Sequence, residues 1–549
     1  MNKLIHQLTD RYAIYLLTAI AAILFFIASS TRHALFQSGG WDLGIFDQAA
    51  YLISRGLEPL SSLTGFHILG DHAAIILYYL GLLYAIYADL HWLLAVQAIA
   101  LTIAAIPIYE LAINAQLNKS AALAIAAIYL LYPAVFNINL FDFHPEVIAL
   151  PGLCWAILFA KRGQIARFSS TVLLVLSCKA ALALTVAAMG IWLLIFERDR
   201  FVSKPELSDQ LEPKQTNQSI SKVEQEINSD RNALLAAACA PEQFSNSNNW
   251  QLWQRKQKIC GAIAIIDGII WFIVATQLII PAIGGENAAI GRHLSRYDYL
   301  GGSFTEIFTN LFTKPQLLLG QVFSLDTLGY LALLAAPLIW LISYRQLTPL
   351  IAAIPALAMN ILASDGAQRD LVHQYSLPVL PFLFLVVIYS WHDRPAYPGL
   401  LRSMRHILLW SLLAFAIISR LSFFGSNYLD RLDTWQADHE AIAYVKSRDP
   451  IIDMRNYRSE KPSVLTTNEI APHLTHRRYV RLAITEPMPT DLNQYDFVLL
   501  NIKHPGWLSN PEFAADLVAR YQDASRSPFA DRYRSVFSQD GVYLFERIK

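Results

Sequence analysis

The chain of 549 residues is poor in charge: Asp, Glu, Lys and Arg make up only 16% of it, whereas a soluble globular protein carries about 25%. This shortage argues against a soluble multidomain enzyme. The 43 basic and 43 acidic residues cancel, so there is no excess positive charge of the kind that binds nucleic acid. Cysteine is also scarce, without CxxC spacing or a zinc-ligand pattern, which argues against a disulfide framework and a cysteine metal site. The four cysteines are Cys154, Cys178, Cys239 and Cys260.

Familiar catalytic signatures are missing as well. The sequence has no P-loop, no GxSxG or HExxH motif and no dinucleotide-binding fingerprint. It also has no internal repeat of fixed period, so a transporter built on obvious repeats gains no support.

Apolar residues dominate instead, at 54% of the chain, with a mean hydropathy of +0.35. Runs long enough to cross a bilayer recur from Tyr12 to Phe424. We therefore predict an α-helical polytopic membrane protein with about 11 transmembrane helices. The first run, 12–30, has no A-x-A cleavage site, which predicts an uncleaved first span.

The basic loop KRGQIAR (161–167) sets the predicted orientation, because positive short loops stay in the cytoplasm. The loop lies on the cytoplasmic side only if the apolar stretch 73–88 does not cross the membrane. That stretch has about 16 residues, short for a span, and we predict that it is interfacial or re-entrant. The remaining spans then place the C-terminal region on the outer side.

Changes in composition divide the chain into four parts. Residues 1–196 form an N-terminal membrane core with a first outer loop at 31–90, and 259–427 form the later membrane helices. Between them, 197–258 is rich in Ser, Asn, Gln and mixed charge, which predicts a disordered cytoplasmic insertion. Residues 428–549 are predicted to form a small soluble extracytoplasmic α/β domain.

Strand-like segments mark this C-terminal domain. SVLTT (463–467), YDFVLLNI (495–502) and GVYLFERI (541–548) are typical of strands, and AADLVARY (514–521) is typical of a helix. QDG at 539–541 indicates a hairpin turn.

Two aspartates follow the first span in GGWDLGIFDQAAYLISRG (39–56). Apolar residues recur there at helical spacing, which predicts an amphipathic helix on the outer membrane surface. Asp42, at its start, and Asp47, one turn further on, are the candidate catalytic residues. The alternative is structural, with Asp42 as an N-cap and Asp47 on a solvated helix face.

Further ionisable residues gather on the same predicted face, in GDH (70–72), in FDFHPE (141–146) and at a break in the apolar stretch 168–196. Ionisable groups at membrane depth are costly and usually functional. Structural alternatives remain open: Glu146 as a partner of the helix dipole, His144 as a cap, and Lys179 reaching to the interface. The candidate substrate-binding residues of this set are His72, Asp142, His144, Glu146 and Lys179.

Two later outer segments complete the candidates. GRHLSRYDYLGGS (291–303) has two arginines, whose guanidinium groups suit phosphate geometry, and VHQYSLP (372–378) begins a span. The alternative for the first segment is an ordered loop paired with its own Asp298. The candidate residues here are Arg292, Arg296, Tyr297, His373 and Tyr375.

The motifs WDLGIFDQ, LGDH, LFDFHPE, SRYDYLGGS, HQYSLPVLPF and PHLTHRR, with the Lys179 region, occur in a characteristic order. Together they resemble an uncharacterised prokaryotic family of predicted membrane proteins, a domain-of-unknown-function family, over most of the chain apart from 197–258. That family is similar to the GT-C glycosyltransferases, which include protein O-mannosyltransferases and lipid A aminoarabinose transferases. The resemblance implies a GT-C-like fold, a catalytic aspartate in the first outer loop and a soluble C-terminal domain.

For individual residues, the resemblance implies that Asp42 is the catalytic aspartate, with Asp47 as a second candidate. Lys179 matches the basic residue of a K-E-D-like motif. Here Ala180 and Ala181 follow it instead of acidic residues. This departure leaves open the alternative that this member of the family has lost its activity.

We therefore expect an inverting glycosyltransferase that uses a polyprenyl-phosphate-linked sugar at the outer face of the cytoplasmic (inner) membrane. Its expected partners are the lipid bilayer and the lipid-linked donor, with no nucleic acid; the oligomeric state is left open. His72, His144 and Glu146 would position the sugar or hold a divalent metal. Two alternatives are a transporter or lipid flippase, and a non-catalytic pseudoenzyme whose soluble domain recruits a partner.

Overall fold

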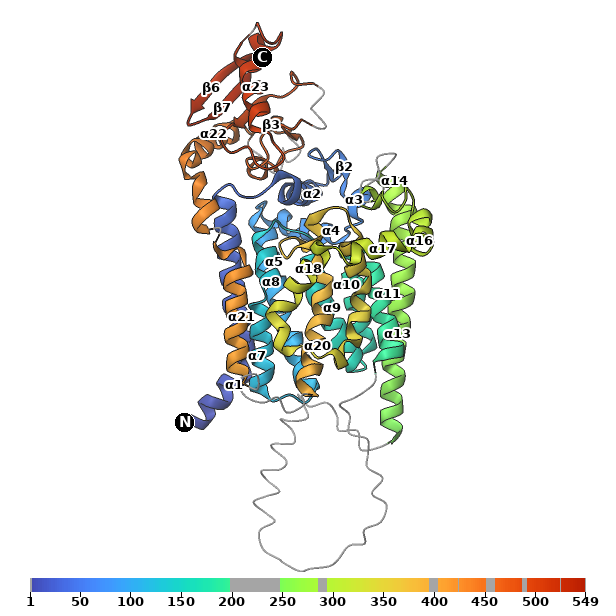
Figure 1. The fold of residues 1–549 in the computed structure, drawn as a ribbon. Helices are drawn as coiled ribbons and strands as arrows, with labels where there is room; N and C mark the ends of the chain where they lie inside the picture. The colour runs from blue at the N-terminus through green and yellow to red at the C-terminus, as the bar shows by residue number, and fades with distance from the viewer. Residues whose placement is uncertain are drawn as a thin grey trace, which may run out of the picture.

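The computed structural model describes residues 2–197, 247–284, 294–393, 403–422, 424–450, 460–485, 491–523 and 525–548. Helices form a bundle, and a small domain containing a β-sheet lies on one end of it (Figure 1). We call this end the domain end and the other the opposite end. The first loop, with α2 (Ile45–Ser54) and α3 (Ile68–His72), lies at the domain end, whereas α13 (Ser247–Ile273) begins at the opposite end.

Long apolar helices confirm a mostly helical multi-pass membrane protein. Among the described residues, four helices are long and apolar enough to cross a bilayer, or six if each of two bent pairs is one span. Five further apolar helices have 10–17 residues. The number of about 11 spans stays a prediction. The four long spans are Tyr12–Ala34, His91–Asn114, Leu252–Gly284 and Gln374–His392.

The first loop is helical, as predicted, but its helix has no solvated face. After α1 (Asn2–Ala34), a π-helical turn at Gly40–Gly44 leads into α2. The C-terminal domain covers α2, so residues 45–52 are all buried and the expected solvated face is absent. A short hairpin of β1 (Leu60–Ser61) and β2 (Phe66–His67) follows.

The stretch 73–88 forms α4 (Ile76–Ile86), an 11-residue helix too short to cross a bilayer, which packs against α2. The chain then runs through the helices that surround FDFHPE. These are α5 (His91–Ile103), α6 (Ala105–Asn114), α7 (Lys119–Leu130), α8 (Pro133–Leu140) and α9 (Glu146–Lys161).

Lys179 interrupts its apolar stretch as predicted. Helix α10 (Ile165–Cys178) ends immediately before it, and α11 (Leu182–Ile191) begins three residues later. The extended backbone of Lys179, with φ of −164° and ψ of 140°, cannot continue a helix. The break places a lysine between two membrane helices.

The predicted insertion 197–258 needs a correction at its C-terminal boundary. Helix α13 begins at Ser247, so residues 247–258 are helical rather than part of a disordered segment. The buried Trp253 explains this, because its indole donates a hydrogen bond of 2.8 Å to the Lys161 carbonyl. Residues 198–246 lie outside the described residues.

The later membrane region is more broken, and short 3-10 turns link several of its helices. Prolines near helix starts account for much of this, since proline fits a first helical turn but not a helix interior. The helices are α14 (Ile280–Gly284), α16 (Phe304–Thr313), α17 (Pro315–Val322), α18 (Leu325–Ala335), α19 (Ile354–Leu362), α20 (Leu380–His392) and α21 (Met404–Ile418).

The C-terminal domain contains a five-stranded mixed sheet in the order β4-β3-β5-β7-β6. The three predicted strands and the predicted helix are present, and the structure adds α22, β4 and β6. The QDG hairpin is confirmed, because Asp540 and Gly541 both have positive φ, as a tight two-residue turn requires. The elements are α22 (Trp435–Ser447), β3 (Val464–Thr466), β4 (Val480–Leu482), β5 (Phe497–Asn501), α23 (Pro511–Gln522), β6 (Tyr533–Gln539) and β7 (Val542–Arg547).

Candidate active site

Asp42 lies in the middle of the π-helical turn at the domain end. Its carboxylate is 17% exposed, and Oδ1 lies 3.5 Å from Nε2 of His144. Of the two candidate aspartates, Asp42 is the one that solvent can reach. It is therefore placed to exchange a proton with a bound molecule.

Burial disfavours the charged form of the His144 imidazole, but the hydrogen bond and charge of Asp42 outweigh it and raise the pKa of His144. Its ring also stacks on Phe141, with centroids 5.4 Å apart. The candidate general base thus faces an oriented imidazole that favours its protonated form.

Asp142 has a structural position behind this pair. Arg32, at the end of α1, forms an ion pair with Asp142, with 2.6 Å between its Nη1 and Oδ1 of Asp142. The backbone N–H of Gly39 donates a hydrogen bond of 2.7 Å to Oδ2 of Asp142. Asp142 thereby fixes the start of the turn that carries Asp42. The sequence did not single out Arg32; its signal was only a basic residue at the end of the first span.

Lys179 reaches the first residue of α9. Its Nζ lies 2.5 Å from Oε1 of Glu146, and the next residue, Ala180, donates its N–H to the carbonyl of His72 at 3.1 Å. His72 in turn lies 2.7 Å from Asp71, between Nδ1 and Oδ2. The acidic partner absent after Lys179 in the sequence is therefore supplied by Glu146 from another helix.

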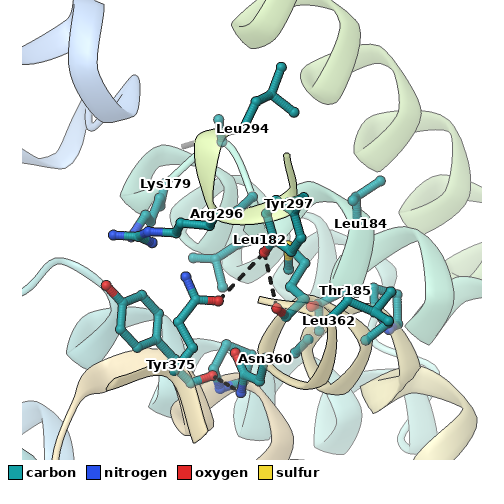
Figure 2. A pocket seen from close by; sticks show the side chains of 18 of the residues that line it. Lys179, Leu182, Leu184, Thr185, Leu294, Arg296, Tyr297, Asn360, Leu362 and Tyr375 are labelled. Carbon is teal, nitrogen blue, oxygen red and sulfur yellow. Dashed lines mark hydrogen bonds between the residues drawn. The ribbon is translucent and has the colours of Figure 1, made fainter. Parts of the chain in front are cut away.

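A cavity of about 450 Å³ opens beside this lysine (Figure 2). Lys179, Arg296 and Tyr375 lie on one side in the view, and Leu184, Thr185 and Leu362 lie on the other. The lysine Nζ and the arginine Cζ lie 5.9 Å and 5.5 Å from the centroid of the Tyr375 ring. Both cations therefore share one aromatic ring at the edge of a largely apolar space.

Buried acceptors also line this cavity. Among the described residues, neither Oε2 of Glu146 nor Oε1 of Gln374 has a hydrogen-bond donor. An unsatisfied buried polar atom is costly, so these atoms favour a ligand with hydroxyl groups. Gln374 was missed by sequence reasoning, because a glutamine next to His373 carries no signal of its own.

The remaining candidate residues from the two later segments differ in whether they line the cavity. Tyr297 lines the cavity. Its hydroxyl donates a hydrogen bond of 3.0 Å to the Met359 carbonyl, so its main contact fixes its own loop to α19. His373 pairs with Asp370 at 2.7 Å, and its ring packs edge-on against Phe141. Arg292 lies outside the described residues.

Asp47 occupies a different environment from Asp42. It is fully buried, and it accepts hydrogen bonds from Tyr84 of α4 at 2.6 Å and from the Thr475 hydroxyl. Nε2 of His476 lies 3.1 Å from its Oδ1. The expectation of a solvated residue is thus wrong: Asp47 links the first loop to the C-terminal domain.

We expect Asp47→Ala to lower the free energy of unfolding by about 3–5 kcal/mol, because buried donors lose a charged acceptor. Thermal unfolding of the detergent-solubilised protein measures this as a lower Tm. Tyr84→Phe removes one donor and should cost about 1.5–3 kcal/mol. A wild-type Tm for Asp47→Ala would contradict the linking role.

His473 makes the docking of the C-terminal domain onto the membrane helices depend on pH. Its ring stacks on His33 of α1, with centroids 4.1 Å apart, and its Nε2 has no hydrogen-bond partner among the described residues. Burial, reinforced by the charges of His33, Lys446 and His439, lowers the pKa of His473 well below its ordinary value. The undocked histidine takes up a proton near pH 6.5, so docking weakens as the pH falls below that value.

We therefore expect acidification from pH 8 to 5.5 to lower the Tm of the wild type more than that of His473→Phe. Glu469, whose pKa is raised to about 7 by burial, acts in the opposite direction but titrates in both proteins, so it cancels in the comparison. Parallel Tm curves for the two proteins would contradict the prediction.

A resident metal is not supported by the donor groups. Within the part of the chain that the structure describes, no group of three or more His, Cys, Asp or Glu side chains is arranged to hold a metal ion. Glu146 is engaged by Lys179, and His72 by Asp71.

A family model for predicted membrane proteins (DUF2079) matches residues 32–544 of the chain. No curated protein matches the chain. Among solved structures, the chain is similar to ArnT from Cupriavidus metallidurans in the apo state, at 10% identity, 97% coverage of both chains and a TM-score of 0.47. With ArnT bound to undecaprenyl phosphate, the values are 10% identity, 97% of this chain, 98% of that chain and a TM-score of 0.43.

It is also similar to the archaeal oligosaccharyltransferase AglB from Archaeoglobus fulgidus in complex with an inhibitory peptide and a dolichol-phosphate. That match has 11% identity, covers 98% of this chain and 75% of that chain, and has a TM-score of 0.38. No residue role is carried over at these identities and TM-scores. The family model, by contrast, covers nearly the whole chain, and the protein therefore belongs to the DUF2079 family of predicted membrane proteins.

Proposed function

We propose that this protein is a glycosyltransferase that moves a sugar from a polyprenyl-phosphate-linked donor to an acceptor hydroxyl group. The observation that carries the proposal is the two-sided cavity, with Lys179 and Arg296 on one side and apolar side chains on the other. The ligand that matches both sides has an anionic head and a long apolar tail. A lipid-linked sugar phosphate has this form, and its sugar hydroxyls suit the unpaired acceptors of Glu146 and Gln374.

Asp42 supplies the base. It removes the proton from the acceptor hydroxyl, whose oxygen attacks the anomeric carbon from the side opposite the phosphate and inverts its configuration. The bond between this carbon and the phosphate oxygen breaks, and the lipid phosphate leaves with the bonding electron pair. A positioned base contributes about 10²–10⁴-fold to such a step.

Lys179 and Arg296 stabilise the negative charge that grows on the leaving phosphate. Charge-assisted hydrogen bonds are about twice as strong as neutral ones, and they act best where water is excluded. Both cations lie close to the Tyr375 ring. Glu146 keeps Lys179 in place, so the absence of acidic residues after Lys179 does not remove its anchor.

The charges also support the outer face of the cytoplasmic membrane as the place of reaction. Arg162 and Arg167 follow α9, which begins with Glu146 at the site and ends where Lys161 pairs with Glu197. Basic loops stay in the cytoplasm. With the 161–167 loop inside, Asp42 and the C-terminal domain lie outside.

The proposal is tested with purified protein in nanodiscs and a panel of radiolabelled polyprenyl-phosphate sugars, followed by loss of lipid-linked label. We expect turnover in the wild type and loss of turnover in Asp42→Asn, with parallel samples in EDTA to report on metal dependence. Movement of an intact substrate across proteoliposomes without chemical change would contradict the proposal and favour a transporter.

A further inference from the structure

The turn that carries Asp42 lies directly against one segment of the C-terminal domain, residues 468–478, which we call the docking segment. Glycines make the approach possible. A Cβ on Gly40 would lie 2.7 Å from Cβ of Ala471, and one on Gly44 would lie 3.3 Å from Cγ2 of Thr475. The first of these distances is too short for any side chain, so the turn and the docking segment fit only with glycine at position 40.

Asn468 makes the polar part of this contact. The backbone N–H of Gly40 donates to two of its atoms, the carbonyl oxygen at 2.9 Å and Oδ1 at 3.1 Å. The backbone of Asn468 is itself fixed, because its N–H donates 2.9 Å to the Pro505 carbonyl. One residue of the C-terminal domain, through its backbone carbonyl and its side chain, thus fixes the backbone two residues before Asp42.

The amide of Asn468 also has a defined orientation. Since Oδ1 accepts from Gly40, Nδ2 points to the other side, where it lies 3.4 Å from the position of a Cβ on Gly39. Oδ2 of Asp42 and Oδ2 of Asp142 flank the same position, at 3.7 Å and 3.3 Å. Nδ2 is buried without an acceptor among the described residues, and it lies in the same small region as the two carboxylates without a hydrogen bond to either.

Farther along, the contact continues without a gap. Nε2 of Gln48 donates a hydrogen bond of 3.0 Å to the Arg477 carbonyl, and the Ser62 hydroxyl donates one of 2.8 Å to the Val480 carbonyl. With the hydrogen bonds of Asp47 to Thr475 and His476, these bonds hold the first loop against the end of the docking segment and the start of β4. The position of Asp42 is therefore set by a domain more than 400 residues further along the chain.

We propose that Asn468 is a positioning residue for Asp42 and that the docking segment is part of the active site. The kinetic consequence rests on the proposed transferase function, whereas the anchoring of the turn does not. A catalytic group must be held to within about 0.5 Å, and a displacement of about 1 Å can cost 10²-fold in rate. The C-terminal domain would then act in the reaction itself, in contrast to a domain that only recruits a partner.

The first test measures anchoring without reference to activity. Hydrogen exchange of residues 38–48, followed by mass spectrometry, should accelerate in Asn468→Ala because the Gly40 N–H loses one of its two acceptors. Asn510→Ala is the matched control: it removes an asparagine that caps α23 in the same domain, and exchange at 38–48 should stay at the wild-type rate. Unchanged exchange in Asn468→Ala would overturn the proposal.

The second test is kinetic. We expect Asn468→Ala to lower kcat by about 10–100-fold with the KM for the lipid-linked donor unchanged, since the Lys179 cavity is not altered. Asn510→Ala should keep the wild-type kcat. A rise in donor KM with constant kcat in Asn468→Ala would contradict a positioning role.

A compensating pair tests the packing. Gly40→Ala should reduce kcat, and adding Ala471→Gly should recover part of it, because the second change removes the nearest obstructing atom. No recovery in a double variant with wild-type Tm would overturn the claim of direct fit. If the wild type turns over no donor while the exchange results hold, the transferase function fails and the anchoring stands.

Discussion

Asp42→Asn should lower kcat for sugar transfer by about 10²–10⁴-fold, the usual contribution of a positioned general base. The asparagine has the shape of the aspartate but cannot take a proton from the acceptor hydroxyl. Donor binding should be unchanged, because Lys179 and Arg296 are untouched. The measurement is transfer kinetics in nanodiscs together with equilibrium binding of the lipid-linked donor.

The matched control is Asp89→Asn. Asp89 is also a partly exposed carboxylate between the first two long spans, and it also pairs with a histidine, His91, at 2.7 Å. Its removal should leave kcat within about 2-fold, since a surface pair is worth at most about 1 kcal/mol. Equal losses in the two variants would mean that Asp42 has no special role.

Lys179→Gln should have a double effect. It removes the cation that faces the leaving phosphate, which should lower kcat by about 10²–10³-fold. It also leaves the buried carboxylate of Glu146 without its partner, at a cost of about 3–5 kcal/mol in stability. Binding of a polyprenyl phosphate, measured by native mass spectrometry, should weaken in parallel with kcat.

Lys161→Gln separates these effects. Lys161 and Glu197 form a second buried lysine–glutamate pair, away from the cavity. Breaking it should cost similar stability, but lipid-phosphate binding and kcat should remain at wild-type values below the Tm. If Lys161→Gln loses binding as strongly as Lys179→Gln, the phosphate role of Lys179 is wrong.

Local features of the fold were predictable from the sequence, because they depend on neighbours in the chain. Long apolar runs require membrane helices, a lysine in such a run indicates a break, and an Asp-Gly pair between strand-like segments indicates a hairpin. The break at Lys179 and the turn at Asp540 and Gly541 are both where the sequence places them.

Contacts between distant segments were not predictable in this way. Helical spacing placed Asp47 off the apolar face, but it cannot distinguish water from a second domain that covers that face. The pairing of Lys179 with Glu146 depends on how two helices pack, and so does that of Arg32 with Asp142. The polar composition of 197–258 predicted a disordered insertion, yet residues 247–258 are helical, and Trp253 packs onto the end of α9.

The hydrogen bond that the Thr475 hydroxyl donates to Asp47 joins groups 428 positions apart, and this has a consequence for biosynthesis. The first loop is synthesised early, while the segment that completes its structure is still to be translated. At about 5–20 residues per second, the loop waits roughly 20 to 90 s with the carboxylate of Asp47 and the donors of α2 uncovered. Throughout that interval the newborn chain has its membrane helices, but the turn that carries Asp42 lacks its partners in the C-terminal domain. A chain that ends before the PHLTHRR stretch would keep these helices and never acquire the contacts of Asp47 with Thr475 and His476.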